Sequence, residues 1–182
     1  MKKSIYYSLL ISAMVAVSVA EETRQVDKHE HGVGELNIAI EGNAIDFEFF
    51  IPGADIVGFE YEAKTESDIA LVNAALEKFG NFDNIFSLPE SSNCNLVNSE
   101  IGVNQDDDHD EHDDHNEEAH NEFVAHYSFN CENIKEIDRI SFPYFTNFPN
   151  SGELEVQFVS EKGSTGFEVE GDEPFIDLKG KI

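Results

Sequence analysis

The sequence predicts an α+β fold, mainly antiparallel β-sheet with one principal α-helix and a long disordered loop rich in His, Asp and Glu. Several short segments alternate apolar and polar residues with the period of two that a half-buried strand requires. One segment, Ile69–Phe79, repeats apolar residues at helical spacing instead. The range 106–122 holds ten carboxylates, four histidines and no Lys or Arg, so it buries too little apolar surface to fold.

Residues 1–20 have the features of a secretory signal peptide. Lys2 and Lys3 precede an apolar run from Ile5 to Val17, and small residues stand at the end, Ser18–Ala20. The run is too short to span a bilayer, which argues against a membrane anchor, and no later stretch is long enough either. We therefore expect 21–182 to be one exported domain, without membrane insertion after signal cleavage.

The exported part begins with a predicted β-hairpin. Two runs of alternating apolar residues flank the turn Glu41–Asn43, and they consist of Leu36, Ile38 and Ile40, then Ile45, Phe47, Phe49 and Ile51. This arrangement is typical of two antiparallel strands with one buried face.

The principal helix is predicted next. Thr65–Asp68 forms a capping box in which Asp68 takes the place of the usual Glu. Apolar residues then recur at steps of three or four, and Gly80 marks the end of the helix. The apolar positions are Ile69, Val72, Leu76 and Phe79.

The two cysteines lie in predicted strands, one in Cys94–Val103 and the other in Phe123–Cys131. An even pair in an exported protein indicates one disulfide, Cys94–Cys131, which would stabilise the fold by roughly 4 kcal/mol. Antiparallel pairing with Cys94 opposite Cys131 would place Leu96 opposite Phe129. A flexible loop would then span 103–122. Shorter strands are expected around Ile140, over Leu154–Phe158, over Phe167–Val169 and over Phe175–Leu178.

The charge balance excludes two classes of partner. Lys and Arg number 11 against 38 Asp and Glu, which gives a formal charge of −27 at pH 7. Nucleic-acid binding requires a basic surface, and anionic membranes would repel this chain. No H-E-x-x-H, G-x-S-x-G or Gly-rich phosphate loop is present, so nothing in the sequence supports an enzyme.

The histidines instead favour a metal site. His109, His112 and His115 are three residues apart, and His120 follows, all among carboxylates that can ligate or support the ligands. The alternative is a solvated acidic loop whose histidines bind nothing. Imidazole is a ligand for zinc, and copper(II) or nickel would also bind in vitro.

Three other histidines are weaker candidates. His29 and His31 are two residues apart and would face the same way on an extended segment, although a flexible terminus explains them as well. His126 is on the polar side of its predicted strand, where a structural role is the alternative. Calcium is disfavoured as the metal because Asp106–Asp108 lacks the D-x-D-x-D-G pattern.

The order of several motifs along the sequence resembles that in the ZrgA family of periplasmic, zinc-regulated zinc-binding proteins. The resemblance is carried by motifs spread over nearly the whole exported chain: His29–Gly32, Leu36–Gly42, Pro52, Gly58–Glu60, Ile85–Leu88, Cys94, the His/Asp/Glu insertion, His120–Cys131 and Phe145–Pro149. It implies zinc binding and a contribution to zinc uptake alongside an ABC-type importer.

The resemblance also implies ligands. The H-x-H motif of the family corresponds to His29 and His31, and the insertion corresponds to His109–His115, with His120 after it. This chain departs from the pattern at Tyr61, where the family often has histidine, and at Ser164, where it often has glutamine. We therefore expect a periplasmic protein that captures or stores zinc. The alternatives are an acidic structural or adhesion module and a calcium-binding domain.

Overall fold

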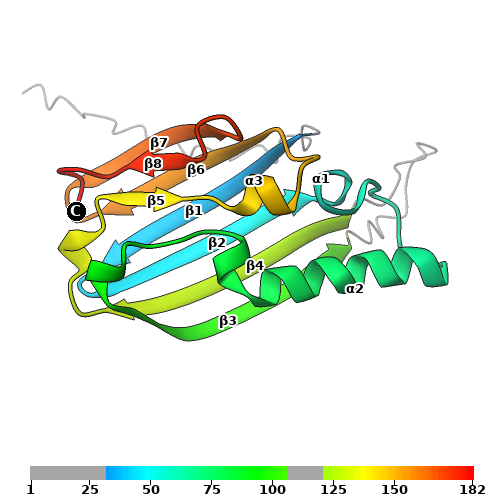
Figure 1. Ribbon diagram of the computed structural model, residues 1–182, viewed down its shortest axis with the longest axis horizontal. Coiled ribbons are helices and arrows are strands. Elements are labelled where there is room, and N and C mark those ends of the chain that lie inside the picture. Colours follow the sequence, from blue (N-terminus) through cyan, green and yellow to red (C-terminus); the bar gives the residue numbers. More distant parts are fainter. Residues whose placement is uncertain (1–31, 106–120) are drawn as a thin grey trace, which may run out of the picture.

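A mixed six-stranded sheet dominates the computed structural model, which describes residues 32–105 and 121–182. The strand order is β3-β4-β2-β1-β6-β7, and neighbours are antiparallel except for the parallel pair β1–β6. A separate two-stranded ribbon pairs β5 with β8 (Figure 1). The bounds are β1 Val33–Glu41, β2 Ala44–Pro52, β3 Cys94–Gln105, β4 Asn121–Cys131, β5 Arg139–Ser141, β6 Glu153–Ser160, β7 Gly163–Glu170 and β8 Phe175–Asp177.

The helices and the β5–β8 ribbon cover one face of this sheet (Figure 1). The helices are α1 Gly53–Val57, α2 Glu66–Gly80 and α3 Tyr144–Asn147, with short 3-10 turns at η1 Phe82–Asn84, η2 Glu90–Ser92 and η3 Ile134–Glu136. Burial alternates along the strands, as in β4, where Phe123, Ala125, Tyr127, Phe129 and Cys131 are buried. The covered face is therefore the core, and the other face, which we call the open face, is exposed.

Aromatic rings fill the core between the sheet and the covering segments. The Phe86 ring stacks on that of Phe47, with centroids 4.1 Å apart, and meets Phe129 edge to face. The Tyr127 hydroxyl donates a hydrogen bond of 2.6 Å to the Phe79 carbonyl, which ties β4 to the last turn of α2. Such contacts join elements distant in sequence and fix the orientation of the sheet under its cover.

The predicted hairpin and helix are confirmed. β1 pairs with β2 around the expected turn, and the Thr65 side chain accepts a hydrogen bond of 3.2 Å from the Asp68 N–H. The apolar stripe of α2 is less buried than the spacing predicts, because Ile69 is 44% exposed. Figure 1 shows the reason: the first turns of α2 extend beyond the strands of the sheet, so no strand lies beneath them.

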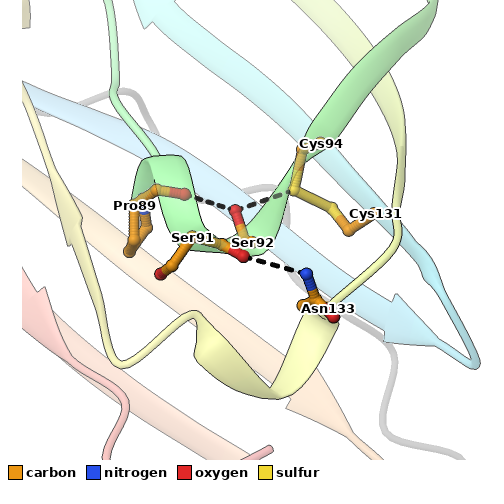
Figure 2. Close-up of a disulfide and its surroundings, with 6 residues drawn as sticks. All are labelled: Pro89, Ser91, Ser92, Cys94, Cys131 and Asn133. Atoms are coloured by element: carbon orange, nitrogen blue, oxygen red, sulfur yellow. Dashed lines mark hydrogen bonds between the residues drawn. A yellow bond between two sulfur atoms is a disulfide. The ribbon is translucent and has the colours of Figure 1, made fainter.

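The disulfide Cys94–Cys131 is also confirmed, and it joins directly opposite residues of β3 and β4 (Figure 2). Leu96 faces Phe129 as expected, and a bulge follows between Leu96 and Asn98. The backbone pairing continues beyond the strands, where the Asn133 N–H donates to the Ser92 carbonyl at 3.0 Å. The disulfide therefore lies within a hydrogen-bonded segment.

Two sequence-based boundaries change. β3 continues to Gln105 and β4 begins at Asn121, so strand pairing extends into both ends of the range 103–122 that we expected to be flexible. The cause is pairing between Val103 and Phe123, whose side chains face the core. The expected signal peptide, 1–20, lies outside the described residues. No helix within the described ranges has the length and apolar character needed to cross a membrane.

Candidate functional site

One end of the sheet receives the chain from both histidine-rich segments. β1 begins after Gly32, β3 ends at Gln105 and β4 begins at Asn121. The register places these points at the same end of the strands, since Gln105 pairs with Asn121 and Pro52 with Glu122, while β1 pairs with β2 from Glu35 opposite Phe50. We call this end the loop end of the sheet.

The short helix α1 anchors the start of β1 at the loop end. The Gly32 N–H donates a hydrogen bond of 2.9 Å to Oδ1 of Asp55, and the Asp55 side chain is buried. The Gly32 carbonyl accepts bonds from the N–H groups of Gly152 and Glu153 at 3.0 and 2.8 Å. Gly32 is thus held from both sides, by α1 and by the segment entering β6.

The same helix and the segment that follows it, Glu60 and Tyr61, anchor the start of β4. The Asn121 N–H donates to the Glu60 carbonyl at 2.7 Å, and its side-chain amide donates to the Tyr61 carbonyl at 3.1 Å. A Cβ on Gly53 would lie 1.6 Å from Asn121 Oδ1, so only glycine allows Asn121 to pack against α1. Asn121 is buried, and its Oδ1 has no hydrogen-bond partner within the described ranges.

Carboxylate charge influences this region. Burial raises the pKa of the Tyr144 phenol above its ordinary value. The hydrogen bond with Ser151 lowers the Tyr144 pKa, and the negative charge of Asp55 raises it. The charge of Asp55 thus acts on the buried phenol of Tyr144, while its carboxylate accepts the N–H of Gly32.

Tyr61 occupies the position where the family resemblance implies histidine. Its ring stacks on Phe59, with centroids 4.6 Å apart, and remains 56% exposed. The ligands typical of zinc are imidazole, thiolate and carboxylate, so a phenol at this position supplies none of them. A site at the loop end of this chain would draw its ligands from other residues.

His126 is away from the loop end. It lies in the middle of β4 on the open face, five positions along the strand from Asn121, which corresponds to roughly 17 Å. Its Nε2 is 3.7 Å from Asp46 Oδ1, and Ser128 donates a hydrogen bond to the same oxygen. In the described ranges, no group of three or more His, Cys, Asp or Glu residues is arranged to hold a metal ion.

The other six predicted ligands lie outside the described residues: His29, His31, His109, His112, His115 and His120. His31 directly precedes Gly32, and His120 directly precedes Asn121. Sequence reasoning missed the anchors Asp55 and Asn121. Asp55 follows Pro52 and Gly53, which predict only the end of the hairpin, and no local sequence pattern connects Asp55 to Gly32.

Comparison with known proteins gives one clear result. Curated protein sequences contain no match to the chain. The family model described as "ZrgA family zinc uptake protein" matches residues 28–178, from before the loop end to the last strand. This chain therefore belongs to the ZrgA family of zinc uptake proteins.

Proposed function

We propose that this protein is exported to the periplasm, captures zinc there and supplies it for uptake. The observation that carries the proposal is the anchoring of Gly32 and Asn121 to α1 and the segment that follows it. The first histidine pair is joined to one anchor, and the histidine-rich segment, 106–120, is joined to the other and to Gln105. Six of the seven histidines in the sequence thus connect to the chain at the loop end.

The proposed ligands are His29, His31, His109, His112, His115 and His120, supported by neighbouring carboxylates. The family supports zinc over other metals. An excess of carboxylates also raises the local concentration of divalent cations, which favours capture from dilute solution. Catalysis requires a preorganised set of groups, whereas capture and release of an ion do not, so we favour a role in uptake over an enzymatic one.

The proposed destination of the zinc is an ABC-type importer in the inner membrane. The role in uptake comes from the family. Periplasmic location is supported by the signal-like residues 1–20 and by the disulfide Cys94–Cys131, which forms in oxidising compartments.

Calorimetric titration with zinc tests the proposal. The chain lacking residues 1–20 is compared with two variants, the double substitution His29→Ala/His31→Ala and a deletion of 106–119 that keeps His120. We expect the deletion to lower the zinc stoichiometry and the double substitution to weaken the tightest binding. Unchanged zinc binding in both variants would contradict the ligand assignment. Preference for calcium over zinc would contradict the proposed function.

A further inference from the structure

The open face of the sheet has an unusual charge distribution. None of the six strands β1, β2, β3, β4, β6 and β7 contains a Lys or Arg. Carboxylates occupy many of the positions that point away from the core, and Figure 1 shows that the covering helices all lie on the other side. The open face is thus acidic and has no cover within the described residues.

Three glutamates on this face stand directly opposite one another. Glu35 of β1 pairs in register with Glu155 of β6, which pairs in register with Glu168 of β7. Neighbouring strands are about 4.8 Å apart, and like charges directly opposite each other destabilise a sheet. All three are exposed, and none forms an ion pair in the part of the chain that the structure describes.

The acidic row borders a depression in the open face. One hollow of about 910 Å³ is lined by Asn37, Ala39, Asp46, Glu48, His126, Gln157 and Val159, among others. A second hollow of about 550 Å³ is lined by Glu155, Gln157, Gly166 and Glu168, with the adjacent strand positions. The two hollows share Gln157, and the surface is recessed at Ala39 and Gly166 because these residues are small. Together they cross five strands, β7-β6-β1-β2-β4, or about 19 Å.

We propose that this depression is a docking groove for a protein segment that presents Lys or Arg side chains. A positive segment would remove the repulsion along Glu35, Glu155 and Glu168, which the described part of the chain leaves uncompensated. A row of like charges that lowers stability and contributes nothing to the fold is expected mainly at functional positions. The proposal goes beyond zinc capture and does not depend on it.

A protein segment fits this face better than a single cation does. The carboxylates are separated at strand spacing, and the described part of the chain contains no group of three that could hold one ion. A groove about 19 Å long matches about six residues of extended chain at 3.3 Å per residue. Exposed Val159 and the flanking Ala39 add apolar contact beside the charges.

The test is a binding titration of the chain lacking residues 1–20 with the peptide (Lys-Val)₅ at near-physiological ionic strength. Binding is followed by backbone amide NMR shifts. The variant Glu35→Gln/Glu155→Gln/Glu168→Gln is compared with Glu66→Gln/Glu77→Gln/Glu90→Gln. The control changes net charge equally, at exposed glutamates on the covering segments. Residues 106–120 are intact in both, so their contribution cancels.

We expect peptide-induced shifts at Asn37, Gln157 and Gly166, and roughly tenfold weaker binding in the open-face variant. The control variant should bind within about twofold of the unmodified chain. Equal weakening in both variants would show that net charge alone drives binding and would overturn the proposal. Shifts confined to 106–120 would also overturn it. The proposal would also be overturned if millimolar Mg²⁺ without peptide caused the same open-face shifts, because the face would then bind cations in general.

Discussion

The carboxylate of Asp55 accepts the backbone N–H of Gly32 across 23 positions of sequence, with a donor–acceptor distance of 2.9 Å. This bond fixes the residue that follows the first histidine pair to a buried side chain of α1. Since Asn121 packs on the same helix at Gly53, α1 determines where two histidine-bearing segments meet the sheet. The stability of this contact should therefore influence both folding and zinc capture.

Substitution of Asp55 by Ala should lower the free energy of unfolding by about 1.5–3 kcal/mol, the usual contribution of a hydrogen bond to a charged group. It should also weaken zinc binding by roughly tenfold, because the unanchored segment must be ordered on binding. Urea denaturation and zinc calorimetry measure the two effects.

Asp55→Asn and Asp172→Ala serve as controls for this prediction. The amide oxygen of Asn can still accept the Gly32 N–H, so Asp55→Asn should retain more zinc affinity than Asp55→Ala. Asp172 is exposed, and its replacement should leave both quantities unchanged. An Asp55→Ala variant with unmodified zinc affinity would show that the anchor has no part in capture.

Loss of the disulfide should reduce stability without reducing zinc affinity. The bridge closes a sequence separation of 37 residues, for which the chain-entropy relation gives about 4 kcal/mol. Cys94 begins β3 and Gln105 ends it, so the bridge is at the opposite end of the strand from the histidine-rich segment. The double variant Cys94→Ser/Cys131→Ser should denature at lower urea concentration. A large loss of zinc affinity in the folded variant would contradict this separation.

Alkaline pH should unfold the protein through its buried phenols. Burial raises the pKa of Tyr127 and Tyr144, so the folded state favours the neutral form of each. This contribution to stability is fully present below the ordinary tyrosine pKa, near 10, and is lost as pH rises above it. Urea denaturation at a series of pH values up to about 11 should show this decline.

Tyr144→Phe isolates one of these groups. At neutral pH the variant should unfold with a free energy about 1 kcal/mol lower, because it lacks the hydrogen bond to Ser151. Above pH 10 its free energy of unfolding should fall less steeply than that of the unmodified protein. Tyr61→Phe is the matched control at neutral pH, since Tyr61 is 56% exposed and its hydroxyl should contribute little to stability. Identical alkaline slopes for Tyr144→Phe and the unmodified protein would contradict the role of this phenol.

Local patterns were sufficient to predict the hairpin, the principal helix and the disulfide. Alternation over Ile45–Ile51 and the capping residue Thr65 act within a few positions, and the strand phases of Cys94 and Cys131 define their register. The parallel pairing of β1 with β6 escaped prediction because about a hundred residues lie between them and no local periodicity encodes a crossover.

The candidate site was predictable only in part, for the same reason. Histidine spacing identified the ligand-bearing segments, but the anchors depend on contacts across 23 positions, Asp55 to Gly32, and 60 positions, Asn121 to Tyr61. The requirement for glycine at position 53 is visible only once Asn121 is in place. Long-range packing, which single-sequence patterns do not describe, thus determines where the segments meet.

His126 should contribute little to zinc capture, because roughly 17 Å of strand separate it from the loop end. His126→Ala should leave the zinc dissociation constant within about twofold, whereas His120→Ala should raise it roughly tenfold. Zinc at a hundredfold excess over its dissociation constant should stabilise the unmodified chain and His126→Ala alike, by about 2.7 kcal/mol. Calorimetry and zinc-dependent thermal denaturation measure both effects, with the two single-histidine variants as each other's control. If His126→Ala lost as much affinity as His120→Ala, His126 would take part in zinc binding, which would contradict the separation of the open face from the zinc ligands.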